Sequence, residues 1–204
     1  VMPFSPRDSK GLLISSIEDN NPVIFIEHRW LHSIKQQVPK SYYKIKIGKG
    51  RVARQGQDIS LVSYSYGVFE CLKASKILKE KFNISAEVID LRTIRPLDKN
   101  IILKSVKKTK RILAVDNSWK SFGVSAEIIS IITDNLKTKD IKKIARIGNI
   151  EVPCPSTRAL AKDFYCNYIT IVNKVLKMLV SKKNYLKKNN LYDDVPDKSF
   201  KGPF

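Results

Sequence analysis

The chain has 204 residues, and its 38 Lys and Arg against 19 Asp and Glu give a formal net charge of +19. A hydrophobic content of 43% with 28% charged residues is typical of a folded protein, which excludes wholesale disorder. No apolar run reaches the ~18–20 residues that a bilayer-spanning helix needs, which excludes a transmembrane span.

The first 35 residues are predicted to hold a helix between two strands. Residues 1–3 are typical of the end of a strand, and apolar residues at helical spacing predict a helix over 9–17, with Pro6 suited to its entry. A continuous run of β-branched and aromatic residues predicts a buried strand over 23–26. We therefore expect residues 1–35 to close an α/β domain whose earlier part is absent.

Residues 36–57 are predicted to be a connector, because prolines and glycines interrupt any regular period, although 44–47 alternates like an edge strand. From 58 to 180, strands alternate with helices, which indicates an α/β fold with a mainly parallel sheet flanked by helices. Residues 181–204 are predicted to form a polar, basic tail. The expected strands are 59–64, 86–91, 111–116 and 141–147, and the expected helices are 67–81, 97–107, 123–136 and 168–180.

The excess positive charge first suggests a nucleic-acid partner, because Lys and Arg release counterions from phosphates. The basic residues are spread along the whole chain, mostly as Lys beside Ile and Asn, and no nucleic-acid-binding motif accompanies them. We therefore expect no nucleic acid among the partners, and we interpret the charge as a solvated, lysine-rich surface.

The three cysteines, Cys71, Cys154 and Cys166, match neither a disulfide framework nor a zinc pattern and suit a reducing compartment. Cys71 falls on the apolar face of a predicted helix, so we expect it in the core. Cys154 lies between two prolines and is expected to pack in a rigid extended loop, without a neighbouring base to activate it. No charged-then-apolar leader opens the chain, so no export is expected.

His28 and His32 are the only histidines. Histidines four apart on a helix could bind a metal, but this segment follows a predicted strand directly and we do not expect it to be helical. His28 could line a pocket, since ligands gather at the carboxyl ends of strands in α/β sheets, or it could be a hydrogen-bonded interface residue. Residues 65–67 could offer backbone N–H groups to an anion at a strand–helix junction, although a single glycine is a weak signal.

The segment that ends the first helix runs Ser16-Ile17-Glu18-Asp19-Asn20-Asn21. Its last carbonyl oxygens lack partners within the helix and carry the negative end of the helix dipole. Asp19 and Asn21 add further oxygens of the kind that hard cations bind. From the residues alone, ordinary capping of the helix by Asp and Asn is the alternative.

Several long segments resemble the β subunit of thiamine-diphosphate-dependent 2-oxoacid dehydrogenases, which are pyruvate dehydrogenase-like enzymes of the transketolase superfamily. The resemblance covers about residues 1–180 in family order. The matching segments are 1–13, 19–23, 86–98, 105–109 and 115–128, and they include Asp90-Leu91-Arg92-Thr93-Ile94 and Asp116-Asn117-Ser118-Trp119.

The resemblance implies the end of a pyrimidine-binding domain over 1–35, a connector over 36–57 and a transketolase C-terminal-type domain over 58–180. It implies an oxidoreductase that decarboxylates a 2-oxoacid such as pyruvate and acylates a lipoyl group, with thiamine diphosphate supplying the carbanion chemistry. The family's activating glutamate and catalytic histidine lie in the half that precedes this chain. No catalytic or thiamine-binding residue can therefore be placed here, and the fragment alone is expected to be inactive.

The resemblance also implies a structural potassium ion held by the backbone carbonyls of Ser16 and Ile17 and by Asp19 and Asn21. The implied assembly is an α2β2 heterotetramer with an α subunit and a second β subunit. A lipoyl acyltransferase core is a further implied partner, although the mixed charge of the chain end differs from the acidic docking groups of relatives. The implied location is the cytoplasm, or the mitochondrial or plastid matrix in a eukaryote.

Three other interpretations remain open from the sequence. A transketolase-like or sugar-synthase-like enzyme would share the superfamily but lack a separate α subunit. A non-catalytic interaction module would be a protein of these 204 residues alone. A nucleic-acid-binding protein would be retained on DNA at physiological salt.

Overall fold

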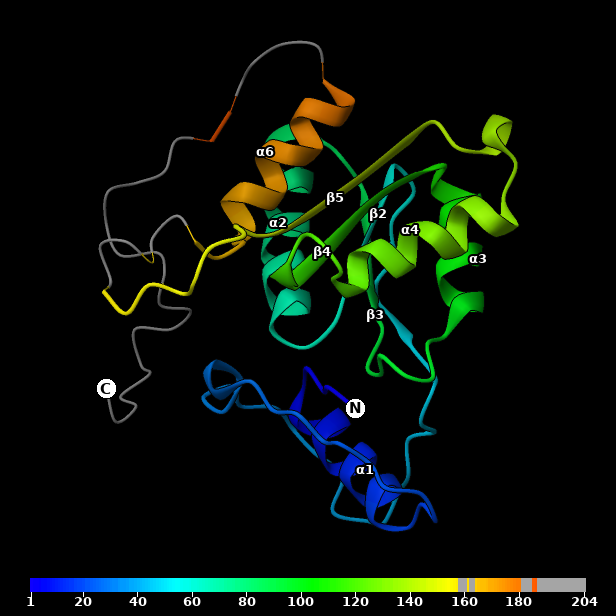
Figure 1. The fold of residues 1–204 in the computed structure, drawn as a ribbon, viewed down its shortest axis with the longest axis vertical. Coiled ribbons are helices and arrows are strands. Elements are labelled where there is room, and N and C mark those ends of the chain that lie inside the picture. The colour runs from blue at the N-terminus through cyan, green and yellow to red at the C-terminus, as the bar shows by residue number, and fades with distance from the viewer. Residues whose placement is uncertain (158–160, 162–163, 181–184, 187–204) are drawn as a thin grey trace.

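The computed structural model describes residues 1–157, 161, 164–180 and 185–186. Its centre is a five-stranded sheet with the order β1-β3-β2-β4-β5 (Figure 1). The strands β2 (Ile59–Ser63), β3 (Ala86–Asp90), β4 (Arg111–Trp119) and β5 (Lys143–Asn149) are parallel, and β1 (Arg51–Arg54) joins the edge of β3 antiparallel. The predicted α/β fold with a mainly parallel sheet is confirmed.

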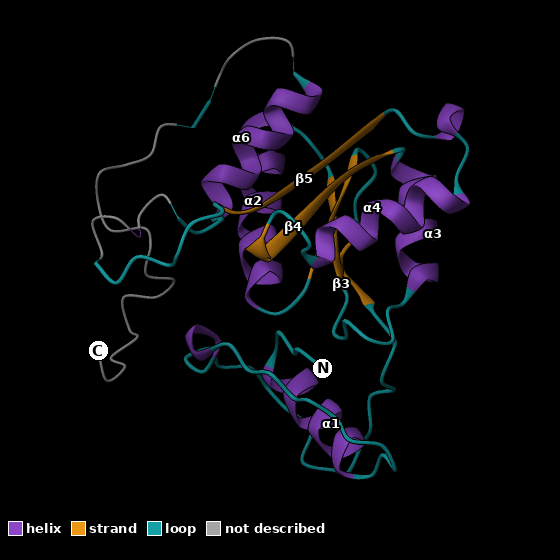
Figure 2. Cartoon of the chain, viewed as in Figure 1, coloured by secondary structure: helices purple, strands orange, loops and turns teal. Residues whose placement is uncertain are grey.

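Helices cover both faces of the sheet (Figure 2). The helices α2 (Tyr66–Phe82) and α6 (Tyr168–Leu179) pack on one face, and α3 (Lys99–Thr109) and α4 (Val124–Asn135) pack on the other. Successive side chains of a strand point to opposite faces. Leu113 and Val115 of β4 accordingly pack with α2 and α6, while Ile112 and Ala114 pack with α3 and α4.

Every strand and helix predicted between 58 and 180 forms, with ends that differ by a few residues. Side-chain caps fix two of the helix starts: Asp98 accepts a hydrogen bond from the N–H of Ile101 at the start of α3, and Asn167 accepts one from Thr170 at the start of α6. The tail predicted over 181–204 lies, apart from 185–186, outside the described residues.

The first 47 residues form a smaller unit beside the sheet, drawn in blue in Figure 1. Its helix α1 (Pro6–Ile17) begins earlier than predicted, because Ser5 caps it by accepting a hydrogen bond from the N–H of Asp8 at 3.2 Å. Pro6 stands in the first helical position, where the missing N–H costs nothing. A single 3-10 turn, η1 (Arg29–Leu31), follows.

Three predicted strand segments of this unit are wrong. Residues 1–3 and 23–26 belong to no sheet, and their pairing is limited to contacts such as Ile26 N–H to the Val1 carbonyl at 2.9 Å. Residues 44–47 do not form an edge strand either, because their backbone bonds to α1 instead. The edge strand is β1, a few residues further along the chain. Among the described residues, no helix is long and apolar enough to cross a membrane.

Candidate functional site

The carboxyl ends of the parallel strands meet at one edge of the sheet, and the unit of residues 1–47 lies against this edge (Figure 1). Ligands of open α/β sheets collect at such an edge. The N–H of Met2 donates to the carbonyl of Arg92, just after β3, at 2.8 Å. This edge is therefore the contact region between the two parts of the chain.

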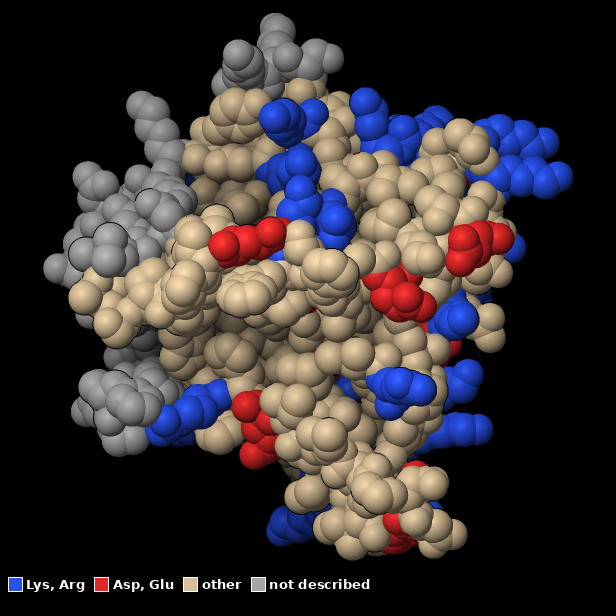
Figure 3. All heavy atoms as spheres, viewed as in Figure 1, with Lys and Arg blue, Asp and Glu red and all other residues tan. Residues whose placement is uncertain are grey.

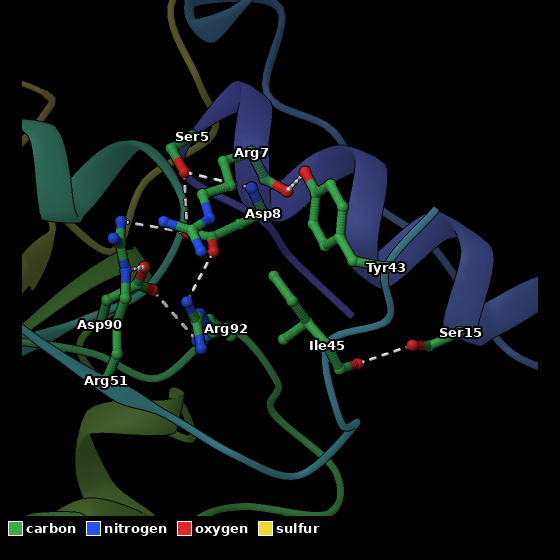
Figure 4. A network of polar contacts seen from close by, with 9 residues as sticks. All are labelled: Ser5, Arg7, Asp8, Ser15, Tyr43, Ile45, Arg51, Asp90 and Arg92. Atoms are coloured by element: carbon green, nitrogen blue, oxygen red, sulfur yellow. Dashed lines mark hydrogen bonds and ion pairs between the residues drawn. The ribbon is translucent and has the colours of Figure 1, made fainter. Parts of the chain in front are cut away.

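Four charged side chains alternate in sign across this contact (Figure 4). Asp8, in the first turn of α1, binds Arg51 of β1 at 3.0 Å and Arg92 at 2.6 Å. Asp90, the last residue of β3, binds Arg51 at 3.2 Å and accepts the backbone N–H of Arg92 at 3.1 Å. We call Asp8, Arg51, Asp90 and Arg92 the charge network.

The burial of its two carboxylates determines how strongly the charge network affects stability. Both carboxylates are fully buried, while Arg51 is about one-third exposed at its side chain. Buried charges are tolerated only when paired and hydrogen-bonded, and Asp8 meets this condition with two guanidinium groups and the Ser5 hydroxyl at 2.8 Å. The network therefore fixes the position of α1 on the sheet, and removing one member would leave the others uncompensated.

The raised pKa of Asp90 makes its contribution to the free energy of unfolding depend on pH. Burial raises this pKa to about 6, aided by the nearby Asp8 carboxylate and opposed by Arg51 and Arg92. An unfolded Asp titrates near ~4, so between about pH 4 and 6 the folded state holds a proton that the unfolded chain has released. The contribution of Asp90 to the free energy of unfolding therefore falls as pH rises through this window.

The variant Asp90→Asn should lack this fall, because an amide does not titrate. We expect the free energy of unfolding of the wild type, minus that of the variant, to decrease between pH 4.5 and pH 7. Urea unfolding at the two pH values measures this difference, in which the titration of other groups cancels. A difference that grows with pH would contradict the assignment of the raised pKa to Asp90.

The connector runs along α1 and is hydrogen-bonded to it. The ammonium group of Lys10 donates to the carbonyls of residues 39, 40 and 41 at 2.6–3.2 Å. Further on, the N–H of Ile45 donates to Gly11 at 3.1 Å, and the carbonyl of Ile45 accepts the Ser15 hydroxyl at 2.7 Å (Figure 4). A Cβ at Gly11 would lie 2.7 Å from side-chain atoms of Tyr43 and Ile45, so this close approach needs glycine. These bonds to α1 explain why 44–47 is not a strand.

The predicted potassium ligands lie together at the carboxyl-terminal end of α1. The carbonyl oxygens of Ser16 and Ile17 accept no hydrogen bond from the described part of the chain. Asn21 folds back so that its N–H and its Nδ2 both donate to Asp19 Oδ1 at 2.9 Å, and these bonds lower the pKa of Asp19. This arrangement leaves Asp19 Oδ2 and Asn21 Oδ1 without a bond from the described residues.

The two histidines flank η1 and do not share a helix face. Both line a hollow of about 400 Å³ beside the start of α1. The ring of His28 stacks on Tyr66 with centroids 4.7 Å apart, burial lowers the His28 pKa, and its buried Nδ1 makes no hydrogen bond within the described residues. Trp30 packs edge-on against Tyr66 and Tyr165. His28 is thus both a pocket-lining and an interface residue, although the hydrogen bond expected at the interface is not made by Nδ1.

Metal binding by side chains alone is not supported by the described residues, which hold no group of three or more His, Cys, Asp or Glu with suitable placement. Cys71 is fully buried in the core as predicted, and burial raises its pKa. Cys154 was predicted to be packed, but it is exposed, with its sulfur 3.0 Å from the Tyr165 hydroxyl. Its loop lies at the surface, where the prolines do not bury it.

The junction at 65–67 has an unusual backbone. Ser65 precedes α2 with φ of 48°, in the left-handed region that residues other than glycine rarely adopt. Gly67 is needed because a Cβ there would collide with the Ser63 hydroxyl. The Ser65 hydroxyl is buried and makes no hydrogen bond within the described residues. The sequence suggested that backbone N–H groups of 65–67 could bind an anion, but the Gly67 N–H donates to the Tyr64 carbonyl at 3.1 Å.

Sequence reasoning missed the charge network and the buried Asp116. Asp116 ends the buried part of β4 and accepts hydrogen bonds from the Tyr64 hydroxyl at 2.5 Å and the Ser125 N–H at 2.7 Å. The available signal was an acidic residue at the end of a buried apolar run, which occurs at both Asp90 and Asp116. In the charge network, Asp8 and Arg92 lie 84 positions apart in sequence, which a local pattern does not reveal.

The described geometry agrees with one known family. The model of the transketolase C-terminal domain matches residues 48–168, which is more than half of the chain and contains the whole sheet. The chain belongs to the transketolase C-terminal domain family. The matched residues form the parallel sheet and most of its flanking helices.

Curated relatives extend the similarity beyond this domain. The chain is 48% identical over 160 residues to the pyruvate dehydrogenase E1 component subunit beta of Bacillus subtilis, covering 78% of this chain and 49% of the relative. The mitochondrial subunit of Saccharomyces cerevisiae is 36% identical over 183 residues, covering 88% and 50%. The Mycoplasma genitalium subunit is 39% identical over 182 residues, covering 87% and 55%. The chain spans about half the length of these relatives.

A solved structure gives the same fold. A split-gene transketolase, described as an inactive β4 tetramer, superposes with a TM-score of 0.71 at 20% identity, covering 87% of this chain and 55% of that chain. At this identity the likeness supports the fold alone.

Proposed function

We propose that this chain is part of the β subunit of a thiamine-diphosphate-dependent 2-oxoacid dehydrogenase. The observation that carries the proposal is the 36–48% identity to pyruvate dehydrogenase E1 β subunits over 160–183 residues. The reaction is the decarboxylation of a 2-oxoacid such as pyruvate, followed by acylation of a lipoyl group. When bound, thiamine diphosphate supplies the carbanion chemistry, and the protein positions it.

We assign residues 1–35 to the end of a pyrimidine-binding domain, 36–57 to a connector and 58–180 to the C-terminal domain. Exposed apolar side chains support this division, because Ile17 and Ile24 are 74% and 77% exposed on the small unit. Such a surface is typical of an element that packs against further strands and helices. The role of this half is to hold α1 in place through the charge network and to provide contact surface.

The same end of α1 supports a structural potassium site. Two carbonyls, one carboxylate oxygen and one amide oxygen are the hard oxygen donors that potassium prefers, and their free lone pairs fit the ion. Ser16 and Ile17 would contribute their carbonyls, and Asp19 and Asn21 their side chains. Any remaining ligands would come from other parts of the complete subunit.

Replacing Asp19 with Ala should abolish most of the potassium-dependent thermal stabilisation of the complete subunit, because one anionic ligand is lost. The melting temperature is measured in potassium and in an equal concentration of choline chloride, which holds ionic strength constant. Glu18→Ala is the matched control, since Glu18 binds Tyr42 and Lys44 instead of belonging to the ligand set. An Asp19→Ala protein that responds to potassium like the wild type would contradict the site.

The proposed assembly is an α2β2 heterotetramer with an α subunit and a second β subunit, and a lipoyl acyltransferase core is a further proposed partner. The proposed location is the cytoplasm, or the mitochondrial or plastid matrix. The names of the relatives as E1 β components support this assembly, and bacterial and mitochondrial relatives support these locations.

The reaction is tested by co-producing the complete subunit with the α subunit of the same organism. We expect dye reduction that requires both a 2-oxoacid and thiamine diphosphate, and a panel of pyruvate, branched-chain 2-oxoacids and acetoin then identifies the substrate. Turnover of sugar phosphates without an α subunit would instead favour a transketolase-like enzyme.

A further inference from the structure

The small unit is attached to the sheet domain twice, once through the charge network and once through aromatic rings. The second attachment is made by residues 27–34, which we call the 27–34 segment. The ring of His28 stacks on the ring of Tyr66, at the start of α2, with centroids 4.7 Å apart and planes 19° apart. Trp30 meets the same Tyr66 ring edge-on at 5.3 Å and contacts Tyr165 at 5.7 Å. These rings hold the 27–34 segment against α2.

The Nδ1 atom of His28 makes this contact sensitive to protons. It is buried and makes no hydrogen bond within the described residues. A neutral imidazole can leave this nitrogen as an unprotonated acceptor, whereas an imidazolium carries an N–H on both ring nitrogens. Protonation would therefore place a charged donor inside the contact without an acceptor, which costs more than leaving a neutral hydrogen bond unmade.

The charged groups on the 27–34 segment itself do not compensate a proton on His28. Glu27 faces His32 at 3.8 Å, and both of these side chains are about half exposed. Arg29 is a further cation of the segment. The neighbouring His32 lowers the pKa of His28, so its effect opposes a positive charge there.

The acidic group of α2 nearest in the chain to Tyr66 is already engaged. The buried carboxylate of Glu70 accepts the Tyr66 hydroxyl at 2.6 Å and the N–H of Tyr168 at 2.6 Å, and Lys73 lies 3.6 Å from it. The Tyr66 ring itself would attract a stacked imidazolium by a cation–π interaction. This gain is smaller than the cost of a buried charged donor that lacks an acceptor.

The other neighbours of the contact add no free charge from the described residues. Beside Trp30, the hydroxyl of Tyr165 lies 3.0 Å from the sulfur of Cys154. Across the hollow, the start of α1 presents serine hydroxyls, and its Asp8 is fully buried in the charge network. Figure 3 shows mainly uncharged atoms along the left part of the boundary between the small unit and the sheet domain, where η1 lies in Figure 1.

The pKa of His28 changes in the direction that this geometry requires. Burial is the main cause of its lowered pKa. A released His28 titrates near ~6.5, so below this pH the released segment binds a proton that the packed segment does not. The contribution of the aromatic contact to stability is therefore complete above this pH and is lost as the pH falls. The contribution of Asp90 has the opposite sign, because it grows as the pH falls.

We propose that the 27–34 segment is a pH-sensitive latch, which packs on α2 while His28 is neutral and is released when Nδ1 takes a proton. α1 stays attached, because the charge network does not lose the contribution of Asp90 in acid. The segment lines one side of the hollow of about 400 Å³, and the start of α1 lines the other. Release of the segment therefore opens this hollow while the sheet remains folded.

Hydrogen exchange read by mass spectrometry tests the latch in the complete β protein assembled with its α subunit. The amides of Leu31, His32 and Ile34 donate to carbonyls within the segment and serve as probes. After correction for the intrinsic rate at each pH, we expect their protection to fall about 5- to 10-fold from pH 7.5 to pH 5.5, as for a released His28 that titrates near ~6.5. In His28→Phe, which keeps a flat ring on Tyr66 without a titrating nitrogen, protection should be the same at both pH values.

Two further variants separate the ring from its charge. His32→Gln removes the other histidine of the segment and is the matched control, which should keep the response to pH. His28→Asn loses the stacked ring and should show at pH 7.5 the low protection that the wild type shows at pH 5.5.

Protection that rises in acid would overturn the latch, because it would mean that the Tyr66 ring holds the imidazolium. A His28→Phe protein that follows the wild type, or loss of the response in His32→Gln, would also overturn it. The readout is exchange and not turnover, so a segment that ignores pH would refute the latch without refuting the proposed reaction.

Discussion

Replacing Asp8 with Ala is expected to lower the free energy of unfolding by about 3–5 kcal/mol, the usual cost of breaking a buried ion pair. Asp8 is fully buried and binds both Arg51 and Arg92. Without it, the two guanidinium groups share Asp90 as their anion, and α1 loses its attachment to the sheet. Urea unfolding measures the loss.

Hydrogen exchange locates the effect of this substitution. The amides of α1 should exchange faster in Asp8→Ala than those of β2 and β4, because the charge network joins α1 to the sheet without forming the sheet. Glu18→Ala, at the exposed opposite end of α1, is the control and should change little, since exposed ion pairs contribute little. Uniform loss of protection across the sheet, with α1 unchanged, would contradict this role of the network.

The second large effect is expected at Asp116. Its carboxylate is fully buried and accepts bonds from the Tyr64 hydroxyl, from the N–H and hydroxyl of Ser118, and from the N–H of Ser125. Asp116→Ala would leave the two buried donors, the Tyr64 hydroxyl and the Ser125 N–H, without an acceptor, at about 1–3 kcal/mol for each one that water cannot reach. We expect a loss of at least about 3 kcal/mol in the free energy of unfolding.

Asp134→Ala is the control: it removes an exposed carboxylate from the next helix, α4, and should leave the free energy of unfolding unchanged. A stable Asp116→Ala protein would show that water replaces the carboxylate.

The fold between 58 and 180 could be predicted because its signals are local. Strands buried on both faces appear as continuous apolar runs, and the amphipathic helices between them set the spacing of a parallel sheet. The predicted strand at 23–26 had the same local signal but belongs to no sheet, because no described strand lies beside it. The predicted strand at 44–47 also failed, since its backbone groups bond to Gly11 and Ser15 of α1.

The candidate site was less predictable because its contacts are long-range. Asp8 and Arg92 each carry an ordinary local pattern, and only the packing of α1 on the end of β3 brings them to 2.6 Å. The set of Ser16, Ile17, Asp19 and Asn21 could be named in advance because the resemblance implied it, and both the set and its potassium ion stay predictions.

The central claim is that this chain belongs to the β subunit of a two-component 2-oxoacid dehydrogenase. Native mass spectrometry of the complete β protein, co-produced with the α subunit of the same organism, tests it most directly. We expect one species with the mass of α2β2 that retains thiamine diphosphate. A complex of β chains alone, or an α2β2 species that takes up no thiamine diphosphate, would contradict it.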